Sequence, residues 1–304
     1  MIHRYLRTAG LSQYQNREEF SVFLDQLQEN CKQNALMIRR KNGERLWEIH
    51  AALGPGIGIV LGGYVNSQGV MVRERYMPFV EETEITSDVY CSIQRHVEGE
   101  EYSGLVDDTR VGIPIIFCLI NGGEYMNRRY FEQNTVPRGV CLTALSKNGK
   151  ILLPMQKNAL QREMSRVADK AREKLIDAAR NGDEAAMESL NSEDMMTFSA
   201  VSRRMMKEDI YSIVDSCFMP QGIECEIYQV IGDILAVNSR INLFTGEEVW
   251  DFLVQANDLP LHVVINQIDL QGEPRVGRRF KGTVWMQGTA VWDDRPPDAS
   301  DKLN

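Results

Sequence analysis

Residues 45–80 of the chain read RLWEIHAALGPGIGIVLGGYVNSQGVMVRERYMPFV. This segment contains three runs rich in branched and aromatic residues, which we predict to be strands: Arg45 to Leu53, Gly56 to Tyr64 and Val70 to Val80. Turn-forming residues from Asn66 to Gly69 separate the second run from the third. Because no segment of helical length lies between the runs, we expect an antiparallel or mixed sheet and not a doubly wound parallel one.

The same pattern continues on both sides of this segment. Further strand-like runs are Ala35 to Arg40, Asp88 to Val97 and Val111 to Ile120. One helix precedes them: Asn16 can cap it, and its apolar residues recur at the spacing of one buried face, at Phe20, Phe23, Leu24, Leu27 and Cys31. Residues 1–156 are therefore predicted to be a β-rich α+β domain with one packed helix.

The glycine cluster at residues 54–63 could suggest a nucleotide-binding loop. A GxGxxG pattern would need a last glycine at position 59 or 61, where Ile59 and Leu61 stand, and no Lys-Ser/Thr pair follows. We interpret the cluster as a glycine-marked bend that leads into a strand.

The middle and last parts of the chain differ in their pattern. Residues 157–220 are predicted to be helical, with an apolar stripe from Leu160 to Ala178, a stop at Gly182 and a helix cap at Asp183. Residues 221–292 read as strands of an antiparallel sheet or small barrel. The tail, residues 293–304, contains Pro296-Pro297 and many charges and is expected to be disordered. The expected fold class is α+β.

The composition excludes several classes of protein. The chain has 304 residues, 43% of them hydrophobic and 25% charged, and a formal net charge of −9. An acidic surface repels phosphate backbones and anionic membranes, so we expect neither nucleic acid nor membrane as a partner. The first residues lack the apolar region of a secretory signal, and we expect a cytoplasmic protein.

The cysteines and histidines give no pattern of metal ligands. No two of the six cysteines form a CxxC pair, and the four histidines stand alone at positions 3, 50, 96 and 262. We therefore expect free thiols, no metal site and no cofactor.

The most distinctive stretch is a basic loop near the C-terminus. Residues 221–304 have a net charge of −6, yet four cations lie within seven residues of this region, at Arg275, Arg278, Arg279 and Lys281. Trp285 follows and could stack on a planar ligand. Arginine forks with accessible amides suit phosphates and carboxylates. These five residues are the predicted site for an anionic small molecule or an acidic protein surface. Alternatively, these cations form ion pairs within the chain, with Glu247, Glu248, Asp251 or Asp269.

We accordingly expect a non-catalytic binding or regulatory module. A second hypothesis is an enzyme with a carboxylate-based site, using Asp107 and Asp108 in a cleft between the N-terminal sheet and the helices. A third is a structural protein that uses the Met-rich segment Met195 to Met206 as a contact face, because methionine surfaces adapt to partners. The sequence leaves the oligomeric state open.

Several motifs resemble those of a family of bacterial proteins of about this length, known as a domain of unknown function. They are Arg4-Tyr-Leu-Arg7, Gly182-Asp-Glu-Ala-Ala, Ile213-Val-Asp, Phe218-Met-Pro, Gly272-Glu-Pro, Gly277-Arg-Arg-Phe-Lys-Gly282 and Trp285-Met-Gln-Gly288. The resemblance implies a bacterial, cytosolic protein and assigns no catalytic or ligand-binding residue.

Overall fold

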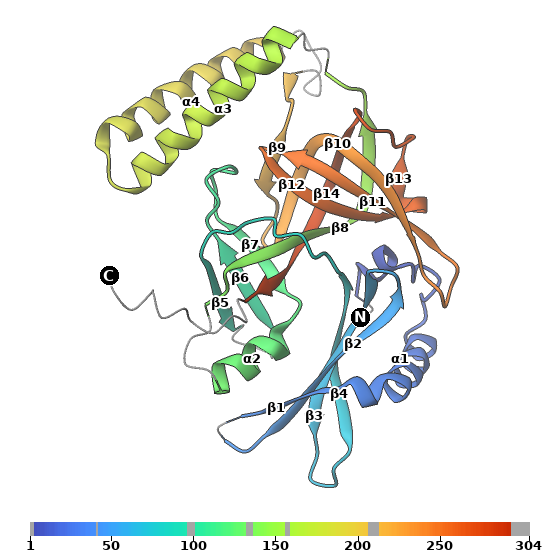
Figure 1. The fold of residues 1–304 in the computed structure, drawn as a ribbon. Coiled ribbons are helices and arrows are strands. Elements are labelled where there is room, and N and C mark those ends of the chain that lie inside the picture. The colour runs from blue at the N-terminus through green and yellow to red at the C-terminus, as the bar shows by residue number, and fades with distance from the viewer. Residues whose placement is uncertain are drawn as a thin grey trace.

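The fold comes from a computed structural model that describes residues 3–40, 42–95, 101–131, 136–155, 159–205 and 213–292. Within these ranges the chain forms a four-stranded sheet, a ten-stranded sheet and several helices (Figure 1). This is an α+β fold, as the sequence predicts. The expected disordered tail, residues 293–304, lies outside the described residues.

The first sheet contains the predicted strands of residues 45–80. Its order is β1-β2-β3-β4, with every pair antiparallel. The bounds are β1 Leu36–Arg39, β2 Arg45–Gly54, β3 Ile57–Val65 and β4 Met71–Val80. Gly56 has a φ of 66° in the turn between β2 and β3, so the glycine cluster is the predicted bend.

Helix α1 (Arg17–Cys31) covers one face of this sheet. It begins at Asn16, whose side chain accepts a hydrogen bond from the backbone N–H of Glu18. The short turns η1 (Leu6–Ala9) and η2 (Lys32–Asn34) flank it. The predicted apolar face is buried against the sheet, in a cluster that includes Phe20, Phe23, Leu24, Leu27, Trp47, Ile49 and Leu61.

The second sheet joins strands from both ends of the chain. Its path is β13-β8-β12-β11-β10-β14-β7-β6-β5, with β9 beside β10 and a further pairing between β8 and β14. The bounds are β5 Cys91–Arg95, β6 Tyr102–Val106, β7 Ile115–Leu119, β8 Gly139–Leu152, β9 Cys217–Pro220, β10 Ile227–Ile241, β11 Glu248–Ala256, β12 Leu259–Asn266, β13 Leu270–Gln271 and β14 Arg279–Val291, with η3 (Gln267–Asp269) before β13.

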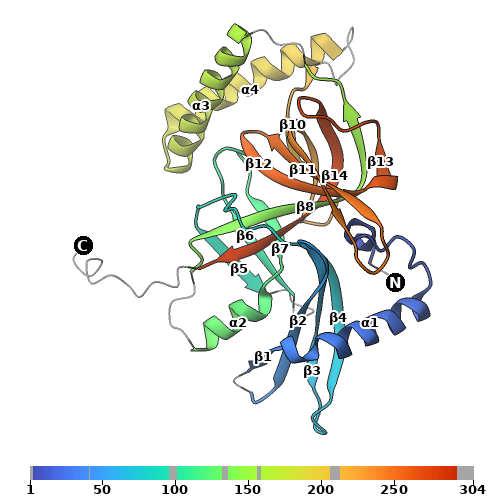
Figure 2. The same cartoon turned by 45° about the vertical axis from the view of Figure 1, so that its right-hand side comes forward.

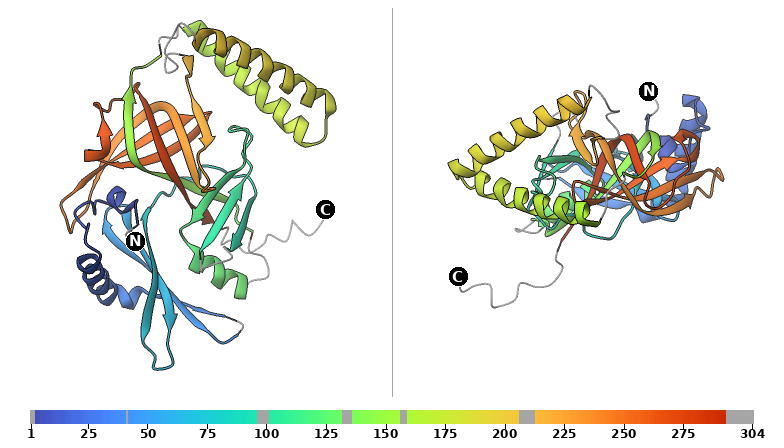
Figure 3. Two further views of the ribbon diagram at one scale, coloured as in Figure 1. Left: turned by 180° about the vertical axis from the view of Figure 1, so that it is seen from behind. Right: turned by 90° about the horizontal axis from the view of Figure 1, so that it is seen from above.

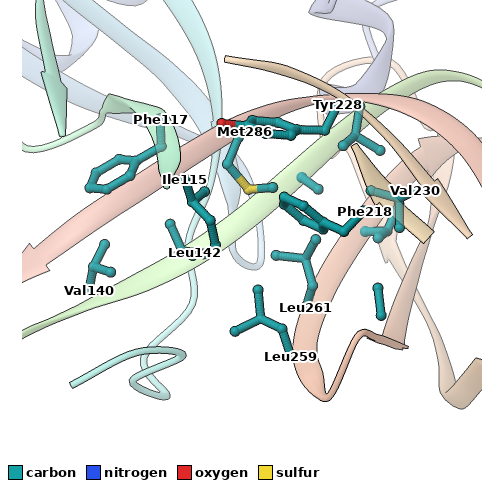
Figure 4. Packing of buried hydrophobic residues seen from close by; sticks show 14 of the residues in the cluster. Ile115, Phe117, Val140, Leu142, Phe218, Tyr228, Val230, Leu259, Leu261 and Met286 are labelled. Atoms are coloured by element: carbon teal, nitrogen blue, oxygen red, sulfur yellow. The ribbon is translucent and has the colours of Figure 1, made fainter. Parts of the chain in front are cut away.

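This second sheet is mixed and strongly curled. Strand β8 pairs in parallel with β12 and β13, and β14 pairs in parallel with β7, while the other pairings are antiparallel. The pairings β8–β12–β11–β10–β14–β8 return to their starting strand. The sheet therefore encloses the main core, whose members in Figure 4 include Ile115, Phe117, Leu142, Phe218, Tyr228, Leu261 and Met286.

The two sheets meet where β3 begins and β4 ends. Tyr5, Ile57 and Val80 from the N-terminal part pack against the outer face of the second sheet in one buried cluster. Their partners there are Leu145, Val249 and Val264. Figure 2 shows the upper end of β2–β4 directly below the curled sheet. An apolar contact thus fixes the first sheet on the second.

A buried acid ties helix α2 (Gly122–Phe131) to the first sheet. Oε1 of Glu48 accepts a hydrogen bond from the backbone N–H of Gly123 at 3.1 Å, and Oε2 accepts one from Arg75 at 2.8 Å. His50 Nε2 lies 3.1 Å from Oε1. A negative charge is stabilised at a helix N-terminus by the unpaired N–H groups there. A Cβ at position 123 would lie 2.8 Å from this oxygen, so the contact requires glycine.

Two long helices form a hairpin between β8 and β9, within residues 157–220, which the sequence predicts to be helical. They are α3 (Ala159–Arg180) and α4 (Glu184–Met205). The end of the predicted segment is not helical, because Cys217–Pro220 form strand β9 by pairing with β10. Gly182 has a φ of 90° in the connection, and the Asp183 carboxylate caps α4 by accepting from the N–H groups of Ala185 and Ala186. Figures 1 and 3 show the hairpin projecting from the sheets. No helix in the described ranges combines the length and apolarity needed to cross a bilayer.

The strands on either side of the predicted domain boundaries share one sheet. Strands β5–β8 precede residue 156, β9 lies in residues 157–220, and β10–β14 follow residue 220, yet all belong to the second sheet. The division of the chain at residues 156 and 220 stays a prediction about independent folding.

We expect Glu48→Ala to lower the free energy of unfolding by about 3 kcal/mol, because it leaves the Arg75 charge and the Gly123 N–H without their carboxylate in a buried place. Urea denaturation of the native protein and the variant measures this free energy. The control is Glu74→Ala on neighbouring β4, where the side chain is exposed and a change within about 0.5 kcal/mol is expected. Equal effects of the two substitutions would show that the Glu48 contacts do not stabilise the fold.

Candidate functional site

The basic loop between β13 and β14 places its arginines in different surroundings. Arg279 is buried, and its guanidinium donates to the backbone carbonyl of Leu153 at 3.0 Å and to that of Val214 at 2.7 Å. These two carbonyls belong to the segments that enter and leave the helical hairpin. Arg279 therefore holds the two ends of the hairpin together.

Arg275 and Arg278 share a nearby acid on the surface. The Arg275 guanidinium donates to the Glu273 carboxylate at 2.7 Å, and Arg278 donates to the backbone carbonyl of Glu273, also at 2.7 Å. The partner is thus an acid two residues away from Arg275, and not one of the four acids that the sequence suggests for internal pairing.

The remaining two predicted residues lie on β14. Trp285 stacks on Tyr5, with ring centroids 5.3 Å apart, and its ring also lies 4.9 Å from that of His3. Lys281 is half-buried and stands opposite Ile231 and Lys150 on the two neighbouring strands. The five residues are therefore not gathered around one ligand-sized space, and anion binding by them stays a prediction.

One acid of the enzyme hypothesis, Asp108, lines a cleft near α3. The cleft is lined by residues that include Thr86, Asp88, Asp108, Arg110, Arg138 and Glu173. Asp108 is buried and accepts hydrogen bonds from Arg110 at 2.6 and 2.9 Å and from the Ser87 hydroxyl at 2.7 Å. Asp107 forms an ion pair with Arg180 at 2.6 Å.

These contacts decide the protonation state of Asp108. Burial acts to raise the pKa of the carboxyl, but the hydrogen bonds from Arg110 and Ser87 outweigh burial and hold the pKa below its ordinary value. A general acid needs a raised pKa. Asp108 is therefore suited to holding the loop before β7 and not to donating a proton.

A charged cluster at the junction of the two sheets is absent from the sequence predictions. It consists of Glu82, just after β4, Arg240 on β10, Asp251 on β11 and His262 on β12. Arg240 donates to one Asp251 oxygen at 2.6 and 2.9 Å, to the Gly56 carbonyl at 2.9 Å and to the Glu82 carboxylate. His262 Nδ1 lies 2.9 Å from the other Asp251 oxygen.

The contacts within this cluster shift the pKa values of Asp251 and His262. The hydrogen bond to Asp251 raises the pKa of His262 above its ordinary value of 6.5. Burial acts to raise the pKa of Asp251, but the hydrogen bond to His262 and the charge of Arg240 outweigh burial and lower it. The cluster therefore contains two carboxylates, one guanidinium and an imidazole that favours the charged form.

The ligand atoms of Glu82, Asp251 and His262 lie within 4.8 Å of one another, which is close enough to hold a metal ion. Nη2 of Arg240, however, already donates to both carboxylates. A metal ion would have to displace a cation that makes five hydrogen bonds to the surrounding groups. The donor set fits an ion-pair cluster that fastens the end of β4 to the second sheet.

This cluster escaped prediction because its members are far apart in sequence. Glu82 lies in an acidic turn that resembles a solvated one, and His262 resembles an ordinary strand residue. The available signal was a charged residue inside an otherwise apolar strand, Asp251 in the run Val249 to Val254.

Residues 6–288 match the model of a protein family described as "Domain of unknown function, E. rectale Gene description (DUF3881)". The chain belongs to this family. No curated protein and no solved structure matches the chain. The match includes both sheets, the helical hairpin and the charged cluster, so these features all lie within the DUF3881 domain.

We expect Arg279→Ala to lower the free energy of unfolding by about 3 kcal/mol, because it leaves the carbonyls of Leu153 and Val214 without their buried donor. Arg275→Ala in the same loop removes a solvent-exposed cation and should change stability by less than about 0.5 kcal/mol. Urea denaturation of both variants measures the difference. A larger effect of Arg275→Ala would contradict the assignment of Arg279 as the residue that holds the hairpin.

We expect the stabilisation that His262 contributes to depend on pH. Its pKa is raised in the folded protein, so its contribution is complete below about pH 6.5 and is lost as the pH rises through the folded value. The difference in unfolding free energy between the native protein and His262→Gln should therefore be largest below about pH 6.5 and shrink as the pH rises above that value. Burial and the charge of Arg4 lower the pKa of His3 to about 4, so the stabilisation that His3 contributes has the opposite pH dependence. Both proteins retain His3, and its contribution therefore cancels in the difference. A difference that grows with pH would refute the assignment.

Proposed function

We propose that the protein is a non-catalytic binding module that docks a helix of a protein partner on its α3–α4 hairpin. The observation that carries this proposal is the exposure of α4. Every residue from Asn191 to Ala200 is exposed. The large apolar side chains among them retain most of their accessible surface: Met195 74%, Met196 70% and Phe198 75%.

An exposed helix of this kind has a physical cost. Isolated helices are marginally stable in water, and most helices in proteins are stabilised by packing an apolar face. The described ion pair between Arg172 and Asp194, at 2.7 Å, joins α3 to α4 but buries no apolar surface there. Packing against a partner would supply the burial that α4 lacks among the described residues of its own chain.

Three apolar residues define one side of α4, which we call the docking face: Met187, Met195 and Phe198. At about 100° per residue they fall within about 80° of one another around the helix axis. Met187 and Phe198 are eleven residues apart and nearly eclipsed. Met196 points away from them, about 180° from Met187. The docking face combines two flexible methionines with one aromatic ring, which suits packing against the apolar face of another helix.

Contacts along α3 and at the base of the hairpin keep the docking face in a constant position. On α3, Glu173 accepts a hydrogen bond from Thr109 at 3.3 Å, and Arg180, at the joined end, pairs with Asp107 at 2.6 Å. At the base, Arg279 holds the entering and leaving segments. A preorganised surface loses less conformational entropy on binding than a flexible one. These contacts support docking by a rigid hairpin over a role as a flexible linker.

The proposal is tested with a photo-crosslinking amino acid at position 198 and, as a control, at position 223, where Ile223 is fully exposed and lies outside the hairpin, between β9 and β10. We expect position 198 and not position 223 to crosslink a distinct protein chain in the cells that make the protein. The purified partner should then bind the native protein at least about tenfold more tightly than Phe198→Glu, because a charge would be buried in the contact. Crosslinks from position 198 only within a single molecule, with no crosslinked pair of chains, would refute the proposal.

A further inference from the structure

We infer that the occupant of the docking face is the same face of a second copy, with the two α4 helices antiparallel about a two-fold axis near Met195. This inference rests on the proposed function and names its partner. It requires that the face be complementary to itself when turned by 180°.

The charges on α4 are arranged in the way that this symmetry requires. The first half of the helix carries only acidic charges, at Glu184, Glu188, Glu193 and Asp194, and the second half only basic ones, at Arg203 and Arg204. With Met195 on the axis, Glu188 of one copy lies across from the turn that contains Arg203 of the other copy. A parallel arrangement would bring acidic half against acidic half. The charge pattern therefore selects the antiparallel one.

The apolar residues follow the same symmetry. Met195 meets its own counterpart at the axis, and Met187 and Phe198 lie on either side of it along the helix. Each contact then occurs twice, so six large side chains leave water when two copies meet. Glu188 and Arg203 lie at the edge of this face, and both are exposed to solvent.

The place of the hairpin in the molecule leaves room for a second copy. Figure 3 shows the joined end of α3 and α4 extending beyond the edge of the sheets. The exposed stretch from Asn191 to Ala200 spans about 15 Å of helix at 1.5 Å per residue. This length is enough for the central contacts of an antiparallel helix pair.

Sedimentation velocity of the full chain over a range of concentrations tests the inference. We expect a dimer in the native protein, and at least about a tenfold weaker dimer in both Glu188→Lys and Arg203→Glu, because each creates two like-charge contacts per dimer. The combination of the two substitutions should restore the native affinity, since it exchanges the signs. Phe198→Glu should give a monomer, and Ile223→Glu, which replaces an exposed apolar residue elsewhere, should dimerise normally.

Any of three results would overturn the second-copy arrangement. The native chain stays monomeric, Phe198→Glu does not weaken the dimer, or the double variant does not regain the native dimer affinity. Peroxide oxidation of dilute monomer, followed by mass spectrometry, separates this failure from failure of the proposed function. Fast oxidation of Met195 in the monomer, relative to buried Met286, shows that the docking face is open to another partner. Slow oxidation shows that its own chain covers it. In the dimer Met195 should be protected and Met196 should remain reactive.

Discussion

The pairing of β14 with β8 is the constraint on which the rest of the structure depends. The two strands pair antiparallel from Arg279 opposite Leu152 to Val291 opposite Gly139. Since β8 precedes the helical hairpin and β14 is the last strand, this pairing joins segments that are more than a hundred residues apart in the sequence. It also completes the ring of pairings that encloses the core. Together with the parallel pairings β12–β8, β13–β8 and β14–β7, it joins the strands after the hairpin to the first half of the chain.

The same pairing explains why the hairpin projects from the protein. Strand β8 ends and β9 begins within the same sheet, so the chain between them must leave and return at one place. Buried Arg279, the first residue of β14, donates to carbonyls on both sides of this place. A residue that the sequence suggests as an anion ligand thus binds the backbone of its own chain. The hairpin is held at its base and remains exposed along α4, where an interaction surface can act without disturbing the core.

Buried charges fix the other connections between the elements. Glu48 binds the N-terminus of α2 and Arg75, and the cluster around Arg240 binds the end of β4 to the second sheet. These charged contacts act in addition to the apolar contact of Tyr5, Ile57 and Val80 with the second sheet. Apolar packing alone is not directional, whereas hydrogen-bonded ion pairs require a particular register. Together they define how the first sheet sits on the second.

The sequence by itself determined the local structure of this protein. Periodicity and turn residues predicted the strands of residues 45–80, the capped helix at Asn16 and the helices around Gly182, because neighbouring residues decide these features. The tertiary structure alone decided which strands pair across the hairpin, and it alone brought Glu82, Arg240, Asp251 and His262 together. It also separated Arg279 from Arg275, which lie four residues apart in the sequence but differ in burial. The physical reason is that burial depends on long-range strand pairing, which encloses Arg279 at the start of β14 and leaves the preceding loop with Arg275 in solvent.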